Sequence, residues 1–211
     1  MSGFDSFVGK SLGEIVKTNL GQNTAHNIEQ RLFEKHGINL TKAVKDFPKL
    51  DSVLREFFGN GAEGIEKQFL QKLITIDQTM KESKEWITIE DRGLTKLILE
   101  CIGEDDKKNI INAVLDKPKI ISDILEACNI PQTSGYRKVN SMIQDGFLIA
   151  NGYEMTHDGK RVNKYISIFN NIRIEIEKNR VIVQVQLTKE SINGSMIIQL
   201  LRGKEQLVRV E

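Results

Sequence analysis

Polar side chains able to contact a nucleic acid are concentrated between residues 133 and 164. Arginine can donate two hydrogen bonds to guanine, asparagine can pair with the edge of adenine, and hydroxyl groups bind phosphate oxygens. The candidate contact residues are Thr133, Ser134, Tyr136, Arg137, Lys138, Asn140, Lys160, Arg161 and Lys164. Residues 131–165 hold five Lys or Arg and three Asp or Glu, so this stretch has a small positive excess that suits a phosphate backbone.

A helix is expected to carry the first six of these residues. Val139, Met142 and Ile143 recur at helical spacing and share one apolar face. The polar residues are therefore expected near the helix start and on its outer face. Thr133 or Ser134 can cap the helix, because a hydroxyl oxygen accepts a hydrogen bond from a free backbone N–H there.

A two-stranded ribbon is expected after this helix. Asp145-Gly146 ends the helix, with glycine at the position that favours positive φ. One strand is predicted from Phe147 onward and a return strand over 162–169, where β-branched and aromatic residues are frequent. Gly159 permits the turn between the strands. The ribbon tip, residues 156–161, therefore presents positive charge to solvent.

Two shorter helices are expected before the polar one. Glu104-Asp105-Asp106 places carboxylates at the start of the first, where the helix dipole stabilises them, and Lys117-Pro118 ends it. Ser122 is expected to cap the second. Residues 119–121 are long enough only for a short strand or a connector. Asn129-Ile130-Pro131 is expected to form the turn into the third helix.

This order of helices and strands resembles the winged helix-turn-helix core of the ArsR/MarR-type prokaryotic transcriptional regulators. The likeness is greatest to archaeal members that end in long strand-rich extensions, and it covers about 65 of the 211 residues. The residues that carry it are Leu125, Gly135-Tyr136, Val139, Met142-Ile143, Gly146-Phe147-Leu148, Gly159-Lys160-Arg161 and Lys164-Tyr165.

The resemblance implies a transcriptional regulator that binds double-stranded DNA as a homodimer, with the third helix in the major groove and the wing on the backbone. The helix expected over 92–102 would form the dimer interface, as helices before the winged core do in this class. The paired-cysteine metal box of the ArsR sensors is missing, so no metal or cofactor is expected. Winged helices also bind proteins, and the alternative is a non-catalytic protein-interaction module.

The N-terminal half is predicted to be a helical bundle. Helices are expected over 5–20 and 23–37, separated by Gly21, and over 48–59, where Pro48 stands in the first turn. A further apolar stripe over 65–74 predicts another helix. Such a bundle can sense a small-molecule or protein effector, or it can serve dimerisation.

The C-terminal segment is predicted to form a β-hairpin. Residues 172–177 and 181–187 alternate between apolar and polar, with a turn over 178–180. The side carrying Ile172, Ile174 and Ile176 must pack on the winged domain, the bundle or a second subunit, because a lone hairpin is marginal in water. A helix over 191–202 and a last strand over 207–210 are also predicted.

The sequence thus predicts an α+β fold: a helical bundle over 1–85, a winged helix-turn-helix domain over 91–169 and a β-hairpin extension over 170–211. The charged stretch 81–85 is the first boundary, and residues 86–89 are a connector or a strand. The 211 residues are 39% hydrophobic and 28% charged, with a net charge of +1, as in globular proteins.

Several classes of protein are not expected. No apolar run approaches 18 residues and no signal peptide is recognised, so a cytoplasmic protein without a membrane segment is predicted. Cys101 and Cys128 fit a reducing compartment as small buried residues. The three histidines are far apart in the sequence and no nucleophile–base arrangement is recognised, so an enzyme is not expected.

Overall fold

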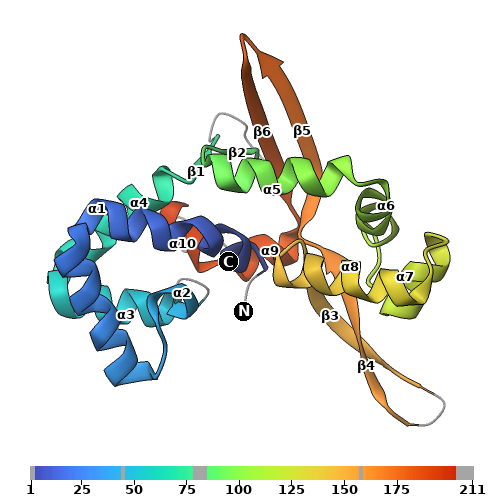
Figure 1. Ribbon diagram of the computed structural model, residues 1–211, viewed down its shortest axis with the longest axis horizontal. Helices are drawn as coiled ribbons and strands as arrows, with labels where there is room; N and C mark the ends of the chain where they lie inside the picture. The colour runs from blue at the N-terminus through green and yellow to red at the C-terminus, as the bar shows by residue number, and fades with distance from the viewer. Residues whose placement is uncertain (1–2, 44–45, 78–84, 157–158, 203–211) are drawn as a thin grey trace, which may run out of the picture.

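The computed structural model describes residues 3–43, 46–77, 85–156 and 159–202. The protein is a mixed α+β molecule with a helical N-terminal region and an antiparallel sheet toward its C-terminus (Figure 1). The N-terminal elements are α1 (Gly3–His36), α2 (Leu40–Ala43), α3 (Phe47–Phe58), the 3-10 turn η1 (Gly59–Gly61) and α4 (Ala62–Gln71). The expected helical character of this half is confirmed.

Glycine and proline divide the N-terminal helices where the sequence predicted. At Gly21 the backbone leaves the helical region with φ 76° and ψ 161°, so α1 is two helical segments across a kink. Gly37, with φ 65°, follows the end of α1, and Gly59, with φ 54°, caps α3. Pro48 lies in the first turn of α3, where the missing N–H has no helical partner to lose.

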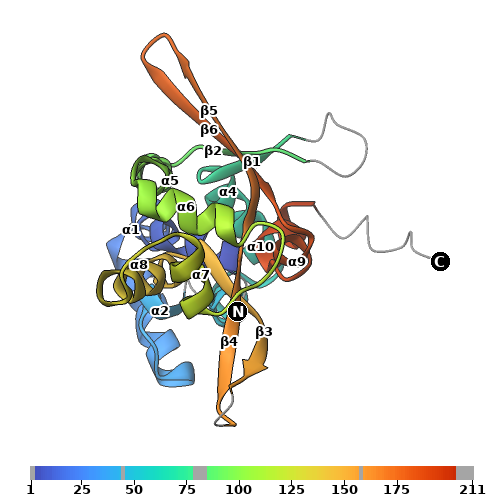
Figure 2. The ribbon, with the colours of Figure 1, turned by 90° about the vertical axis from the view of Figure 1, so that its right-hand side faces the viewer.

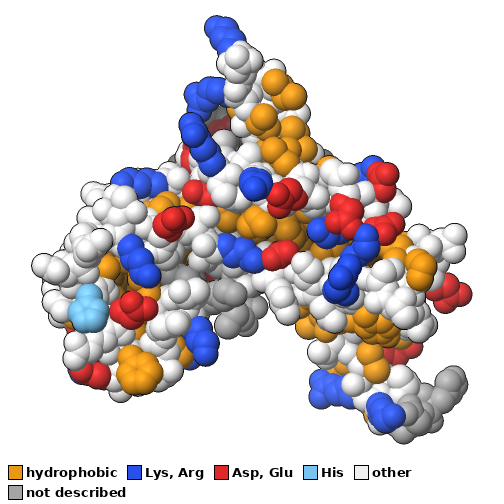
Figure 3. Space-filling model, in the orientation of Figure 1, with side chains coloured by type: hydrophobic (Ala, Val, Ile, Leu, Met, Phe, Trp, Pro, Cys, Tyr) orange, Lys and Arg blue, Asp and Glu red, His pale blue; other side chains and the backbone are white. Residues whose placement is uncertain are grey.

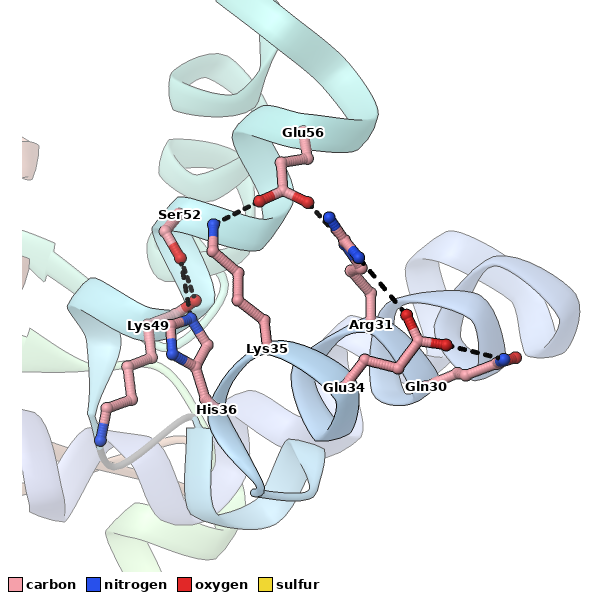
Figure 4. A network of polar contacts seen from close by, with 8 residues as sticks. All are labelled: Gln30, Arg31, Glu34, Lys35, His36, Lys49, Ser52 and Glu56. Carbon is pink, nitrogen blue, oxygen red and sulfur yellow. Dashed lines mark hydrogen bonds and ion pairs between the residues drawn. The ribbon is translucent and has the colours of Figure 1, made fainter.

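A network of polar contacts joins the second half of α1 to α3 (Figure 4). Glu56 accepts hydrogen bonds from the Nε of Arg31 at 2.7 Å and from Lys35, and the pKa of its carboxyl falls to about 2 as a result. The Nε2 of His36 lies 3.2 Å from the Oγ of Ser52, within hydrogen-bond distance. Exposed ion pairs contribute little free energy of unfolding, so the packing of apolar side chains between these helices remains the main stabilising term.

A four-stranded antiparallel sheet joins the middle of the chain to its end. It contains β1 (Ile74–Ile76), β2 (Ile87–Ile89), β5 (Phe169–Glu177) and β6 (Arg180–Leu187) in the order β1-β2-β6-β5. Of the two roles expected for residues 86–89, strand pairing is the one observed. The hairpin expected over 172–187 is confirmed.

Two predicted boundaries near this sheet are wrong. Ile74 was expected on the preceding helix, but α4 ends at Gln71 and Ile74 opens β1, opposite Ile89. Phe169 was expected at the end of the wing's return strand, but it opens β5. Both errors have one cause. A short run of β-branched or aromatic residues forms a strand when a distant segment of the chain is available to pair with it, as Ile89 does with Ile74 and Leu187 with Phe169.

The C-terminal helix was expected as one element and is two, α9 (Lys189–Asn193) and α10 (Met196–Arg202). The buried side chain of Asp5 accepts hydrogen bonds from the hydroxyl of Ser195 and from the N–H of Met196 at 3.1 Å, and so caps α10 from the start of α1. Burial raises the pKa of Asp5 despite these bonds. α10 packs on α3 and α4, which brings the C-terminal segment onto the N-terminal bundle.

One continuous cluster of buried apolar side chains extends through all three predicted domains. At its centre the ring of Phe7 lies 5.6 Å from that of Phe147 and 5.7 Å from that of Phe169. A Cβ on Gly146 would stand 2.8 Å from the backbone nitrogen of Phe7, so glycine is required for this approach as well as for its φ of 82°. The division into three domains stays a prediction, and the segments share one core.

Parts of three predictions lie outside the described residues: the boundary over 81–84, the wing tip at 157–158 and the strand over 207–210. Within the described ranges, no helix combines the length and the apolar character needed to cross a bilayer.

Candidate nucleic-acid interface

The candidate contact residues lie on α8 and on the hairpin that follows it. The elements of this region are α5 (Arg92–Gly103), α6 (Asp105–Ala113), α7 (Ile121–Ala127), α8 (Gln132–Gln144), β3 (Leu148–Met155) and β4 (Arg161–Ser167). This is the predicted order. Outside the named strands, Lys119 donates to Tyr165 at 3.0 Å and accepts from it at 2.7 Å, so the chain before α7 adds a third, minimal strand beside β4.

Several predicted helix ends are wrong. α6 ends at Ala113, a turn before Lys117-Pro118. Ser122 does not cap α7, which begins at Ile121 after the extended residue Ile120. Neither Thr133 nor Ser134 caps α8, because Pro131, with φ −57° and ψ 136°, turns the chain into the helix at Gln132.

The turn between α7 and α8 is tight. Asn129 has φ 54°, and the N–H of Ile130 donates to the carbonyl of Leu125 at 2.9 Å, which closes the end of α7. A Cβ on Gly135 would stand 2.4 Å from the side chain of Leu125, so the two helices approach closely through this glycine. α8 therefore packs closely against α7.

α8 separates its residues into a buried and an open face. Gly135, Val139 and Met142 are buried, at spacings of four and three. Thr133, Tyr136, Arg137 and Asn140 are exposed and fall on the opposite face, with Tyr136 42% exposed. Ser134 is half-buried and donates to the carbonyl of Pro131 at 3.2 Å. The four exposed side chains are brought together as the sequence predicted.

Lys138 points away from that open face. Its ammonium forms ion pairs with Glu104, and with Asp106 at 2.9 Å, both at the start of α6. Hydrogen bonds to Asp106 and Glu104 raise the pKa of Lys138. Its charge is already paired with two carboxylates of the same chain, so a phosphate would have to displace both to reach it.

Arg161 and Lys164 lie on opposite faces of the β3–β4 hairpin. The pairing Met155↔Arg161 and Tyr153↔Asn163 puts Arg161 on the side of Tyr153, and its Cζ stands 3.5 Å from the centre of that ring. Lys164 lies on the other side, 2.8 Å from Glu154. Because successive side chains alternate across a strand, Arg161 and Lys164 cannot contact one flat phosphate surface together.

The tip of the hairpin adds features that the sequence interpretation missed. Tyr153 and Met155 are 51% and 57% exposed beside Arg161. Their spacing of two, in register with Arg161, was the available signal. Gly152, with φ 82°, lies in a β-bulge between Ala150 and Tyr153, and such a bulge increases the local twist of the strands. Lys and Arg side chains mark the end of this hairpin at the lower right of Figure 3.

Metal binding and thiol chemistry find little support in the described residues. They contain no group of three or more His, Cys, Asp or Glu placed to hold a metal ion. Burial raises the pKa of the Cys101 thiol to about 12 and that of the Cys128 thiol in the same direction. Thiols that stay protonated are poor nucleophiles.

No protein-family model, curated protein or solved structure matches the chain. Its functional interpretation therefore depends on the geometry of α8 and the β3–β4 hairpin.

Proposed function

We propose that residues 105–167 form a winged helix and that the protein is a sequence-specific, DNA-binding transcriptional regulator. The observation that supports this most directly is on α8. Arg137 and Asn140 are exposed one turn apart, and within the described residues neither side chain has an ion pair or a hydrogen bond. Side chains of these types, exposed on a well-packed helix and without partners among the described residues, suit the reading of base edges.

In this mechanism α8 enters the major groove and the hairpin contacts the flanking backbone. Arg137 pairs with guanine, Asn140 with adenine, and the hydroxyl of Thr133 with phosphate. Lys160 and Arg161 bind phosphate from the hairpin tip, with the ring of Tyr153 holding the guanidinium of Arg161 in place. Lys138 and Lys164 contribute less to phosphate binding, because each already forms ion pairs with carboxylates of the same chain.

A homodimer would read two half-sites separated by one helical turn of DNA or a multiple of it. The N-terminal bundle would then place an effector site on the same rigid core as α8, since Phe7 of α1 packs directly on Phe147 after α8. An effector that shifts α1 would reach the DNA-binding helix through this contact.

The test is retention of fragmented genomic DNA by the purified protein over a series of salt concentrations, with sequencing of what is retained. The proposal expects a shared sequence that is enriched by the wild type. The double variant Lys160→Ala, Arg161→Ala should lose affinity for all sequences and reduce the salt slope by about 2. Lys17→Ala, Lys96→Ala removes two exposed charges elsewhere and should change neither.

The second candidate is a protein-interaction module, and the acidic start of α6 favours it. Glu104 and Asp106 form ion pairs with Lys138 of α8, and Asp105 between them in the sequence is exposed, so carboxylates lie close to this helix and would repel phosphate. If the wild type retains no duplex even at low salt, the DNA-binding proposal is wrong. The open face of α8 would then be tested for a protein partner with Arg137→Ala and Tyr136→Ala.

A further inference from the structure

The β5–β6 hairpin, residues 169–187, is called the arm below. It projects from the body on the side opposite to the β3–β4 hairpin (Figures 1 and 2). The sequence predicted that its apolar side would be covered. The structure covers only the base: Val183 and Val185 are buried, whereas Ile174 is 38% and Ile176 78% exposed, and hydrophobic side chains are visible along the arm in Figure 3. Clustered apolar exposure of this kind marks an interaction surface.

The arm also presents an open strand edge. β5 is the last strand in the order β1-β2-β6-β5, so no strand of the described residues pairs with its outer side. A two-residue turn, Lys178-Asn179 with φ 43° and 67°, closes the pair Glu177↔Arg180. In such a hairpin the closing pair exchanges both hydrogen bonds, and residues on β5 then alternate. Ile172, Ile174 and Ile176 therefore direct their backbone N–H and C=O groups outward, toward a further strand.

We infer that this edge pairs with the same edge of a second copy of the chain, β5 antiparallel to β5, across a twofold axis at Ile174. In this register Ile174 lies opposite Ile174 of the second copy, and Ile172 lies opposite Ile176. Arg173 then lies opposite Glu175 on both sides of the axis. The strand is self-complementary in its charges and in the positions of its isoleucines, as a twofold interface requires.

The neighbouring symmetric registers are worse for stated reasons. A twofold axis at Ile176 would place Glu175 opposite Glu177, and like charges opposite each other destabilise a strand pair. An axis at Ile172 would extend the pairing to Phe169, across the irregularity between Phe169 and Asn171. Only the register centred on Ile174 pairs Arg with Glu and uses the regular part of the strand.

Within one chain the two charged residues are only weakly engaged. The Nε of Arg173 is 3.8 Å from the carboxylate of Glu175, and both side chains are about half exposed, at 49% and 48%. The guanidinium of Arg173 also lies 4.4 Å from the centre of the Trp86 ring, which holds it over the sheet. Each residue is thus available to a partner strand without breaking a buried contact.

The pairing also gives the exposed tip an apolar neighbour. Ile172 and Ile174 line a cavity of about 270 Å³ together with Ile102 of α5 and Leu115 after α6. Ile176 of one copy would lie beside Ile172 of the other, at the rim of this cavity. A twofold axis closes the assembly at two chains, which protects the edge from continued association.

This inference deepens the proposed function, because it assigns an interface to the homodimer proposed there, but its evidence comes from the arm alone. Because the β3–β4 hairpin points away from the arm, the pairing leaves α8 and its neighbours open. The oligomeric state can therefore be measured without DNA, and its outcome is separable from that of the DNA-retention experiment.

The experiment is sedimentation equilibrium of the full chain in three forms. These are the wild type and two separate single variants with reversed charge, Arg173→Glu and Glu175→Arg. The wild type should be a dimer at micromolar concentration. Each variant alone should dimerise at least about tenfold more weakly, because like charges then face each other twice. An equimolar mixture of the two should restore dimers, because a chain with two acidic residues at these positions then faces a chain with two basic ones. Glu190→Arg, an exposed reversal on α9, should leave the dimer unchanged.

Restored association in the mixture would support this register, since a folding defect in either variant could not be repaired by mixing. A monomeric wild type would overturn the inference. So would a dimer that both reversals leave intact, or a mixture in which no heterodimer forms. Circular dichroism of each variant checks that the fold is retained.

Discussion

The β3–β4 and β5–β6 hairpins have the same secondary structure, but their exposed side chains differ in chemical character. β3–β4 carries Arg161 over Tyr153 on one face and Lys164 paired with Glu154 on the other. β5–β6 carries exposed Ile174 and Ile176 along an open edge. A cationic, aromatic tip suits a polyanion, whereas an apolar edge with alternating charge suits another strand. The comparison teaches that the type of element says less about its partner than the residues on its free faces.

The largest expected effect comes from Phe169, which joins the two hairpins. Its ring is 1% exposed and packs on Phe7 and Phe147. Phe169→Ala should lower the free energy of unfolding by about 3–5 kcal/mol, because it leaves a cavity where both hairpins leave the body. Chemical denaturation measures this. The exposed ring of Tyr153 is the control, and Tyr153→Ala should cost less than about 1 kcal/mol. Equal losses would mean that the hairpins do not share this core.

A pH effect is expected from the bundle, outside both hairpins. Glu66 is 1% exposed, and burial together with the nearby Asp51 raises the pKa of its carboxyl from 4.5 to about 8. The folded state then favours the protonated form. This contribution to stability is present below pH 4.5 and is lost as pH rises toward 8.

Glu66→Gln should therefore flatten the stability profile between about pH 5 and 8 and raise the free energy of unfolding near pH 8 by about 1–3 kcal/mol. Thermal unfolding over that pH range tests it. Variants of either hairpin should keep the wild-type slope, which makes them the controls. A wild-type profile that is flat over this range would contradict the prediction.

Base preference should depend on the open face of α8. Arg137→Ala should relax discrimination at one base pair of a retained site, by about 1–3 kcal/mol, because a bidentate pair with guanine is lost. Competition binding with single-base variants of the site measures it. Glu190→Arg, an exposed change on α9 outside α8 and the arm, should leave the base preference unchanged. A uniform loss across all bases in the α8 variant would assign Arg137 to phosphate instead.

The smallest expected effect concerns the ring beneath Arg161. Tyr153→Ala should weaken DNA binding about two- to fivefold, because an exposed cation–π contact is worth about 0.5–1 kcal/mol. Tyr153→Phe keeps the ring and should bind as the wild type does. Fluorescence anisotropy with a labelled duplex resolves such differences. An equal loss in both variants would show that the hydroxyl, and not the ring, matters.

Local features were predictable because each depends on a few neighbouring residues. Gly21, Gly37, Gly59 and Gly146 end helices as expected, since only glycine adopts their positive φ without strain. The alternation over 172–187 also identified the arm and its turn. Helix N-caps were predicted less well: at Pro131 the ring set the start of α8 in place of the expected hydroxyl caps.

Contacts between distant parts of the chain were not predictable. β2 pairs with β6 nearly a hundred residues later, and Ile74 joins that sheet instead of its helix. Glu104 and Asp106 take Lys138 away from the candidate interface, although nothing in the local pattern of α8 separates it from Arg137. Gly135 fits against Leu125, which is a matter of shape between two helices.

The amino-acid sequence by itself determined the helices, the two hairpins and the face of α8 that stays open, because periodicity and turn residues act over a few positions. Only the tertiary structure decided which cations remain available and which apolar side chains remain uncovered. Ion pairing and burial depend on what the rest of the chain brings to a surface. The free face of α8 and the free edge of β5 are therefore properties of the folded protein, and they are where its partners should be sought.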